Sequence, residues 1–219
     1  MKRITSRTIP NLPDSIILYL GQTSECPAEV ESFLSRAEID KYRSIKSRHR
    51  ALEFITGRWL LQSLMGEQGF ERGDWQIEYG SSGKPWIKMR QMEAGSSQIP
   101  IGIAHTYHAV LAGISFDTSF GVDIESKDRV AHTTLKERIV RYEPLEKTRE
   151  ESAIRVWSIK EAVLKLCGDG LRLGMDKVTI IKWYSWGCRV SMNGKRDAVV
   201  ASCIVEGFWI AVAWYSEPE

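Results

Sequence analysis

Apolar residues along this chain recur with two different periods, which predicts a mixture of strands and helices. Segments in which apolar and polar positions alternate, and short apolar runs between turn residues, are typical of strands. We therefore expect strands at residues 15–20, 75–79, 101–104, 109–115, 121–125, 178–182, 188–192, 198–205 and 208–215.

Helices are expected where apolar residues recur every three to four positions. The clearest case begins after Ser47, which can cap a helix N-terminus, and runs to Met65, because Gly66 should end it. Further helices are expected at residues 28–33, 36–42, 133–142 and 145–166, and residues 93–100 read as an exposed loop.

The order of these elements indicates two halves. Residues 109–115 and 210–216 resemble each other as strands of small and apolar residues, one near the end of each half, and no long linker lies between the halves. We therefore expect an α+β protein with halves at residues 1–118 and 119–219. The halves should pack tightly, with the functional site between them.

Composition narrows the class of protein. The chain has 219 residues, of which 43% are hydrophobic, so it can bury a core as one or two domains. A net charge of +2 argues against nucleic acid as the main partner. The four cysteines form no CxxC pair, and the apolar run at residues 16–20 is too short for a signal peptide or a membrane span. We expect a soluble cytoplasmic protein with reduced thiols and no membrane partner.

Two short motifs carry candidate chemistry. In the predicted strand at residues 121–125, Asp123 and Glu125 alternate with apolar residues, so both carboxylates should point to one face. In the predicted helix, Trp157, Glu161 and Lys165 are spaced four residues apart and should share one stripe. Oxygen ligands suit Mg²⁺, which usually takes one or two carboxylates together with substrate phosphates.

Each motif also has a purely structural interpretation. Asp123 and Glu125 could line the exposed face of an edge strand, and Glu161 could be a solvated partner of Lys165. Such an i,i+4 pair is worth only about 0.2–0.5 kcal/mol. This structural interpretation explains the Glu161–Lys165 pair, but it explains neither Trp157 nor the glycines after the helix. The two motifs together therefore favour a metal site.

The segments GVDIE (residues 121–125) and WSIKEAVLK (residues 157–165) resemble the two signature motifs of the 4′-phosphopantetheinyl transferases. The similar stretches are residues 120–125 and 156–171, including the run Gly168-Asp169-Gly170-Leu171. The length resembles the surfactin-synthetase-activating type, whose single chain contains two similar halves, and not the short type, which trimerises. The resemblance implies a pseudo-dimeric fold with two α+β halves, each an antiparallel sheet packed on helices, in a monomeric protein.

The resemblance also implies an activity. It predicts Mg²⁺-dependent transfer of 4′-phosphopantetheine from coenzyme A to the serine hydroxyl of an apo acyl or peptidyl carrier protein, with release of 3′,5′-ADP. Asp123, Glu125 and Glu161 would hold the metal. Glu161 would be the catalytic base, a metal ligand or both, and Lys165 would act in catalysis and contact the coenzyme A diphosphate.

The nucleotide end of coenzyme A has its own candidates. Lys84 lies in a Gly-Lys-Pro turn and His105 follows a predicted strand, where each resembles a family residue that contacts a coenzyme A phosphate. Where similar transferases carry an arginine one turn before a glycine, this chain has Glu53. Arg50 is near enough along the helix to bind the nucleotide phosphate in place of that arginine. Arg48 is the second candidate.

Two other functions are compatible with these residues. A non-catalytic descendant could bind coenzyme A or a carrier protein without turnover. A different Mg²⁺ enzyme could act on nucleotide diphosphates without a carrier protein.

Overall fold

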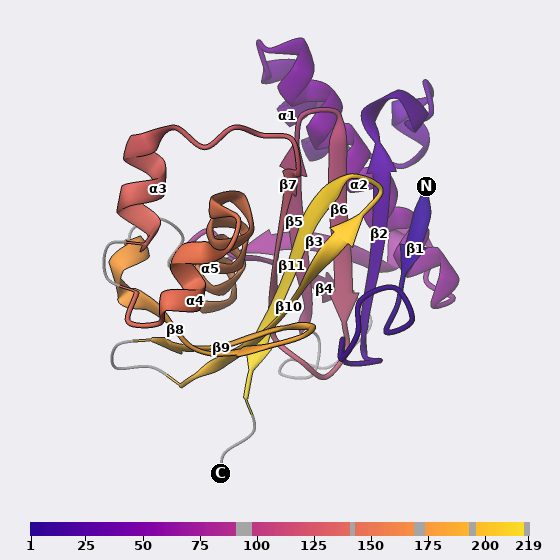
Figure 1. Ribbon diagram of the computed structural model, residues 1–219. Coiled ribbons are helices and arrows are strands. Elements are labelled where there is room, and N and C mark those ends of the chain that lie inside the picture. The colour runs from indigo at the N-terminus through magenta and orange to yellow at the C-terminus, as the bar shows by residue number, and fades with distance from the viewer. Residues whose placement is uncertain (91–97, 141–142, 169–173, 193–195, 217–219) are drawn as a thin grey trace.

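The computed structural model describes residues 1–90, 98–140, 143–168, 174–192 and 196–216. Two antiparallel sheets pack face to face, and helices cover their outer faces (Figure 1). In the view of Figure 1, the helices α3, α4 and α5 lie at the left, while α1, α2 and the first strands lie toward the upper right. This arrangement confirms the predicted α+β fold with two similar halves.

The first sheet has the strand order β1-β2-β6-β5-β4-β3, so it is built from the first six strands of the chain. The bounds of these strands are Lys2–Ile4 (β1), Ile16–Gln22 (β2), Trp75–Tyr79 (β3), Pro85–Met89 (β4), Gln98–Thr106 (β5) and Ala109–Ser115 (β6).

The helices of the first half are α1 (Arg36–Ser44) and α2 (Arg48–Glu67). Ser47 caps α2, as predicted, by accepting a hydrogen bond from the backbone N–H of Arg50. The buried side chains of Leu60, Leu61 and Leu64 pack α2 against the outer face of the sheet. This packing places the first turns of α2 beside the end of β5, where His105 lies.

The second sheet has the strand order β7-β11-β10-β9-β8. Its strands are β7 (Phe120–Ser126), β8 (Val178–Tyr184), β9 (Gly187–Met192), β10 (Ala198–Val205) and β11 (Phe208–Tyr215). The helices of this half are α3 (Thr133–Val140), α4 (Glu146–Glu150) and α5 (Ala153–Cys167), and α5 buries its apolar side against the outer face of the sheet.

Residues along β7 face the two sides of the sheet alternately, and this alternation positions the candidate carboxylates. Phe120, Val122 and Ile124 enter the core between the two sheets. The residues between them therefore face the other way, toward α5. Gly121 makes this close approach possible, because a Cβ atom there would lie 2.1 Å from the backbone oxygen of Ala162 on α5.

Several predicted elements need correction. Residues 28–33 are not an α-helix; only a 3-10 turn forms at Val30–Ser32. A segment this short is a poor helix nucleus, and Val30 and Phe33 pack into a small cluster around Ile55 instead. The predicted helix at residues 145–166 is two helices, because Glu151 and the residue after it are not helical.

Other differences lie at element ends. Gly66 lies inside α2, which continues to Glu67, and Gly69 has the positive φ of +82° that follows the helix. Strand β5 already begins at Gln98, within the predicted loop, and β1 and β4 were not predicted as strands. The glycine run after α5, from residue 169 on, lies outside the described residues.

Within the described ranges, no helix is both long enough and apolar enough to cross a membrane.

Candidate active site

The predicted carboxylates gather between β7 and α5. Strand β7 supplies Asp123 and Glu125, and α5 supplies Glu161 and, one turn later, Lys165. Lys165 Nζ lies 2.6 Å from Asp123 Oδ1 and so links helix to strand. The charges of Glu125 and Glu161 both act on Asp123, which shows that the three carboxylates are electrostatic neighbours.

Asp123 is the most buried of the three, with a relative exposure of 5%. Burial raises its pKa to about 6, the neighbouring carboxylates add to this rise, and Lys165 opposes it. Among the described residues, no hydrogen-bond partner is found for the buried atom Asp123 Oδ2. A buried acceptor without a partner is costly, so this atom is suited to binding a cation or a donor that the protein alone does not supply.

Glu125 is held by two donors on one oxygen. The indole Nε1 of Trp157 donates to Glu125 Oε1 at 3.0 Å, and the guanidinium of Arg129 contacts the same oxygen. Its second oxygen, Oε2, has a long contact of 3.5 Å with the hydroxyl of Thr106. Trp157 therefore orients a carboxylate of the site, which explains its place in the motif.

Glu161 is half-buried on α5. Burial raises its pKa, and the charge of Glu125 raises it further, while Lys165 and Arg129 lower it. A carboxyl with a raised pKa is better able to accept a proton near neutral pH than an ordinary glutamate.

The oxygen atoms of these carboxylates are suitable ligands for a divalent cation, but the side chains are not arranged as a closed coordination site. Within the described residues, no three His, Cys, Asp or Glu side chains form an assembled metal-binding group. The structure instead pairs Asp123 with Lys165 and Glu125 with Arg129. The mutual repulsion of three carboxylates and the unpartnered Asp123 Oδ2 are the features that a bound Mg²⁺ would relieve.

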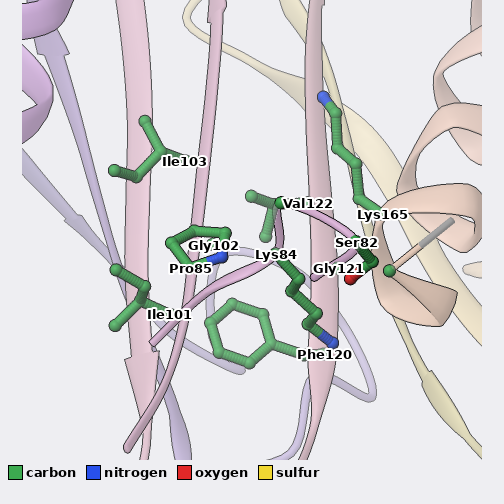
Figure 2. Close-up of a pocket in the computed structure, with 12 residues that line it drawn as sticks. Ser82, Lys84, Pro85, Ile101, Gly102, Ile103, Phe120, Gly121, Val122 and Lys165 are labelled. Atoms are coloured by element: carbon green, nitrogen blue, oxygen red, sulfur yellow. The ribbon is translucent and has the colours of Figure 1, made fainter. Parts of the chain in front are cut away.

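A cavity of about 170 Å³ lies at the start of β7 and the end of α5 (Figure 2); Lys165 lines it, but the three carboxylates are not among its described lining residues. Its lining comes from both halves and includes Lys84, Gly102, Phe120 and Lys165. Drug-sized ligands usually occupy about 300–1,000 Å³, so this cavity has room for only part of a larger ligand.

The structure brings Lys84 to this cavity but gives it a second role. Lys84 Nζ donates to the backbone oxygen of Leu166 at 2.7 Å, near the C-terminus of α5, where a cation is favourable. Burial lowers the pKa of Lys84. In Figure 2 the side chains of Lys84 and Lys165 extend in opposite directions, so they do not form one phosphate clamp in this structure.

His105 lies in a separate polar cluster at the end of β5. Arg50 Nη1 is 3.2 Å from His105 Nε2, and the buried carboxylate of Glu53 is 3.3 Å from His105 Nδ1. Burial lowers the pKa of His105; Glu53 opposes this effect, and the charges of Arg50 and Lys165 add to it. The influence of Lys165 shows that this cluster lies near the carboxylates. Arg50 contacts His105, whereas no contact between Arg48 and His105 is found among the described residues.

Sequence reasoning missed one residue at the site and one groove elsewhere on the protein. Arg129 was not singled out, although its i,i+4 spacing from Glu125 is a detectable signal. A second groove, of about 830 Å³, lies along α1, α2 and β3. In it Arg58 pairs with Glu38 at 2.9 Å and donates to the hydroxyl of Tyr79 at 2.7 Å. No periodicity in the sequence joins these elements, so only the fold reveals the groove.

Comparison with known proteins agrees with this geometry. Residues 119–213 match the model of the 4′-phosphopantetheinyl transferase superfamily. A relative from Nostoc sp. (strain PCC 7120 / SAG 25.82 / UTEX 2576), the 4′-phosphopantetheinyl transferase HetI, is 27% identical over 172 residues. That similarity spans 73% of this chain and 71% of HetI, so it extends well into the first half. The motifs of β7 and α5 lie within the matched residues and meet at one site, so the second half of the chain is similar to the 4′-phosphopantetheinyl transferase superfamily.

Proposed function

We propose that this protein transfers 4′-phosphopantetheine from coenzyme A to the serine hydroxyl of an apo acyl or peptidyl carrier protein. The serine oxygen would form a new bond to the β-phosphorus, the bond to the leaving 3′,5′-ADP would break, and the serine proton would pass to a base. The gathering of Asp123, Glu125 and Glu161 beside Lys165 carries this proposal, because similarity to the superfamily alone does not require an intact site.

Each residue of the site then has a role. Asp123, Glu125 and Glu161 would hold Mg²⁺, which when bound supplies positive charge to the diphosphate. Lys165 would move its ammonium from Asp123 to a phosphate oxygen, where negative charge develops. Glu161 would accept the serine proton, directly or through a water, because its raised pKa suits this task.

We further propose that one chain provides a complete site, as in the surfactin-synthetase-activating type. The half at residues 119–219 contributes the carboxylates and Lys165, while the half at residues 1–118 contributes His105 and Arg50. A monomer is the state that this division of labour favours, and we propose that it is cytoplasmic. Measuring the molar mass by light scattering tests the oligomeric state.

The function is tested with the intact protein, coenzyme A, Mg²⁺ and a panel of apo carrier proteins, read by intact mass. We expect at least one carrier to gain the mass of one phosphopantetheine group, and the gain should disappear with EDTA or in Glu161→Gln. Binding of coenzyme A without any mass gain would indicate a non-catalytic module. Cleavage of coenzyme A in the absence of a carrier would indicate a different diphosphate enzyme.

Arg50 and His105 are expected to bind the 3′-phosphate of coenzyme A. Charge-assisted hydrogen bonds contribute about 1.5–3 kcal/mol, so Arg50→Gln and His105→Ala should each raise KM for coenzyme A by about tenfold or more. KM for dephospho-coenzyme A should change little, because this substrate lacks the 3′-phosphate. Arg48→Gln is the matched control, since Arg48 is exposed and lies two residues before Arg50. Equal losses with both substrates would place the cluster at another part of the cofactor.

A further inference from the structure

The contact between Arg129 and Glu125 has no part in the function proposed above. Arg129 follows the turn after β7, where its backbone N–H donates to the oxygen of Ser126 at 3.1 Å. Its guanidinium contacts Glu125 Oε1 and lies over the ring of Trp157, with 5.8 Å from Cζ to the ring centroid. Arg129 is 41% exposed, whereas Glu125 is 11% exposed.

This contact places a fixed positive charge on a carboxylate that is proposed to bind a metal. Two cations that share one carboxylate repel each other, and the repulsion is stronger near a partly buried group than in water. A divalent cation therefore meets Arg129 as a competitor at one of its three proposed ligands, Glu125.

The contact is also exchangeable. An exposed arginine loses little when it leaves an ion pair, because water can solvate the guanidinium again. Trp157 donates to Glu125 at 3.0 Å and would keep that carboxylate in place without Arg129.

We propose that Arg129 is a displaceable counter-cation of Glu125 that sets the metal affinity of this site. In the metal-free protein, Arg129 neutralises Glu125 and reduces the repulsion among the three carboxylates. When a divalent cation binds, Arg129 leaves Glu125 and remains over Trp157 or enters solvent. This inference rests on the proposed metal site, which the first control below tests separately.

Mn²⁺ is a suitable probe, because it favours the same oxygen ligands as Mg²⁺ and its free form can be counted by electron paramagnetic resonance. We expect Arg129→Gln to bind Mn²⁺ about tenfold more tightly than the wild-type protein, in the absence of coenzyme A and without turnover. Arg129→Lys keeps the charge and should remain near the wild-type affinity. The gain should shrink at high salt, because salt screens the charge of an exposed arginine.

Two control variants separate the possible outcomes. Asp123→Asn should lose Mn²⁺ binding; if it binds like the wild-type protein, the proposed metal site and the role of Arg129 both fail. Lys127→Gln removes one charge from an exposed residue for which no ion pair is found within the described ranges. If Lys127→Gln tightens binding as much as Arg129→Gln, only overall charge matters and the specific role of Arg129 is wrong. If Asp123→Asn abolishes binding but Arg129→Gln binds no more tightly than wild type, the metal site stands and Arg129 is not its competitor.

Discussion

Asp123→Asn should reduce phosphopantetheine transfer by about 10²- to 10³-fold while the protein remains folded. Asparagine preserves the shape of the side chain but removes the charge that pairs with Lys165 and is proposed to bind Mg²⁺. Losing a metal ligand removes several kcal/mol of charge stabilisation from the reaction, and each 1.36 kcal/mol is a factor of ten in rate. The measurement is kcat/KM for a carrier protein that the wild-type enzyme modifies. Near-normal activity of the variant at low Mg²⁺ would contradict the assignment of Asp123.

The same variant should change the pH dependence of stability in the metal-free protein. The pKa of Asp123 is about 6 when folded and near its ordinary value of 3.8 when unfolded. The folded state therefore binds more protons between these two values, so this group lowers the free energy of unfolding as pH rises from about 4 to 6. The full effect is on the order of 3 kcal/mol, because each pKa unit corresponds to about 1.36 kcal/mol.

Asp123→Asn removes this penalty, so the variant should gain stability relative to the wild-type protein as pH rises through this window. Denaturant unfolding of both proteins in EDTA at pH 4.5 and pH 7.5 measures the difference. Carboxyls far from Asp123 titrate alike in both proteins and cancel in the comparison. A variant that loses stability relative to the wild-type protein between pH 4.5 and pH 7.5 would show that ionised Asp123 stabilises the fold.

Local patterns predicted the acidic part of the site. The alternation along residues 120–125 required Asp123 and Glu125 to share a face, and the helical spacing placed Glu161 and Lys165 on one stripe. Both relations depend only on backbone geometry within one element. The long helix α2 and its cap were predictable for the same reason, because Ser47 and the apolar stripe lie within one stretch of chain.

Features that depend on contacts between distant elements could not be predicted in this way. Lys84 was expected only as a phosphate contact, but its bond to Leu166 joins residues 82 positions apart. Glu53 was seen only as a departure from the family pattern, whereas the fold makes it the buried acceptor between Arg50 and His105.

Lys160 is the other residue of the WSIKEAVLK motif whose role depends on the fold. Its position on α5 is about 100° from Glu161, so helix geometry alone does not decide whether it faces a partner protein or the interior. The structure buries it: Lys160 Nζ lies 2.5 Å from Glu143 Oε1, and the two side chains are 2% and 1% exposed. Glu143 Oε2 in turn accepts a hydrogen bond from the backbone N–H of Ile180 at 3.0 Å. This buried pair joins α5 to the segment before α4 and to strand β8.

Lys160→Met should therefore destabilise the protein by about 3–5 kcal/mol, because it leaves the charge of Glu143 buried and unpaired. For a chain of this size, the loss corresponds to a fall in melting temperature of roughly 10 °C or more. The double variant Lys160→Met/Glu143→Gln should recover much of the loss, since glutamine removes the charge and can still accept from Ile180. Lys177→Met is the matched control, because Lys177 pairs with Asp176 at the surface and should change stability by about 1 kcal/mol or less. Thermal and denaturant unfolding of the three variants tests the pair. If Lys160→Met matches the Lys177 control, or if the double variant is no more stable than the single one, the unpaired charge of Glu143 is not the cause.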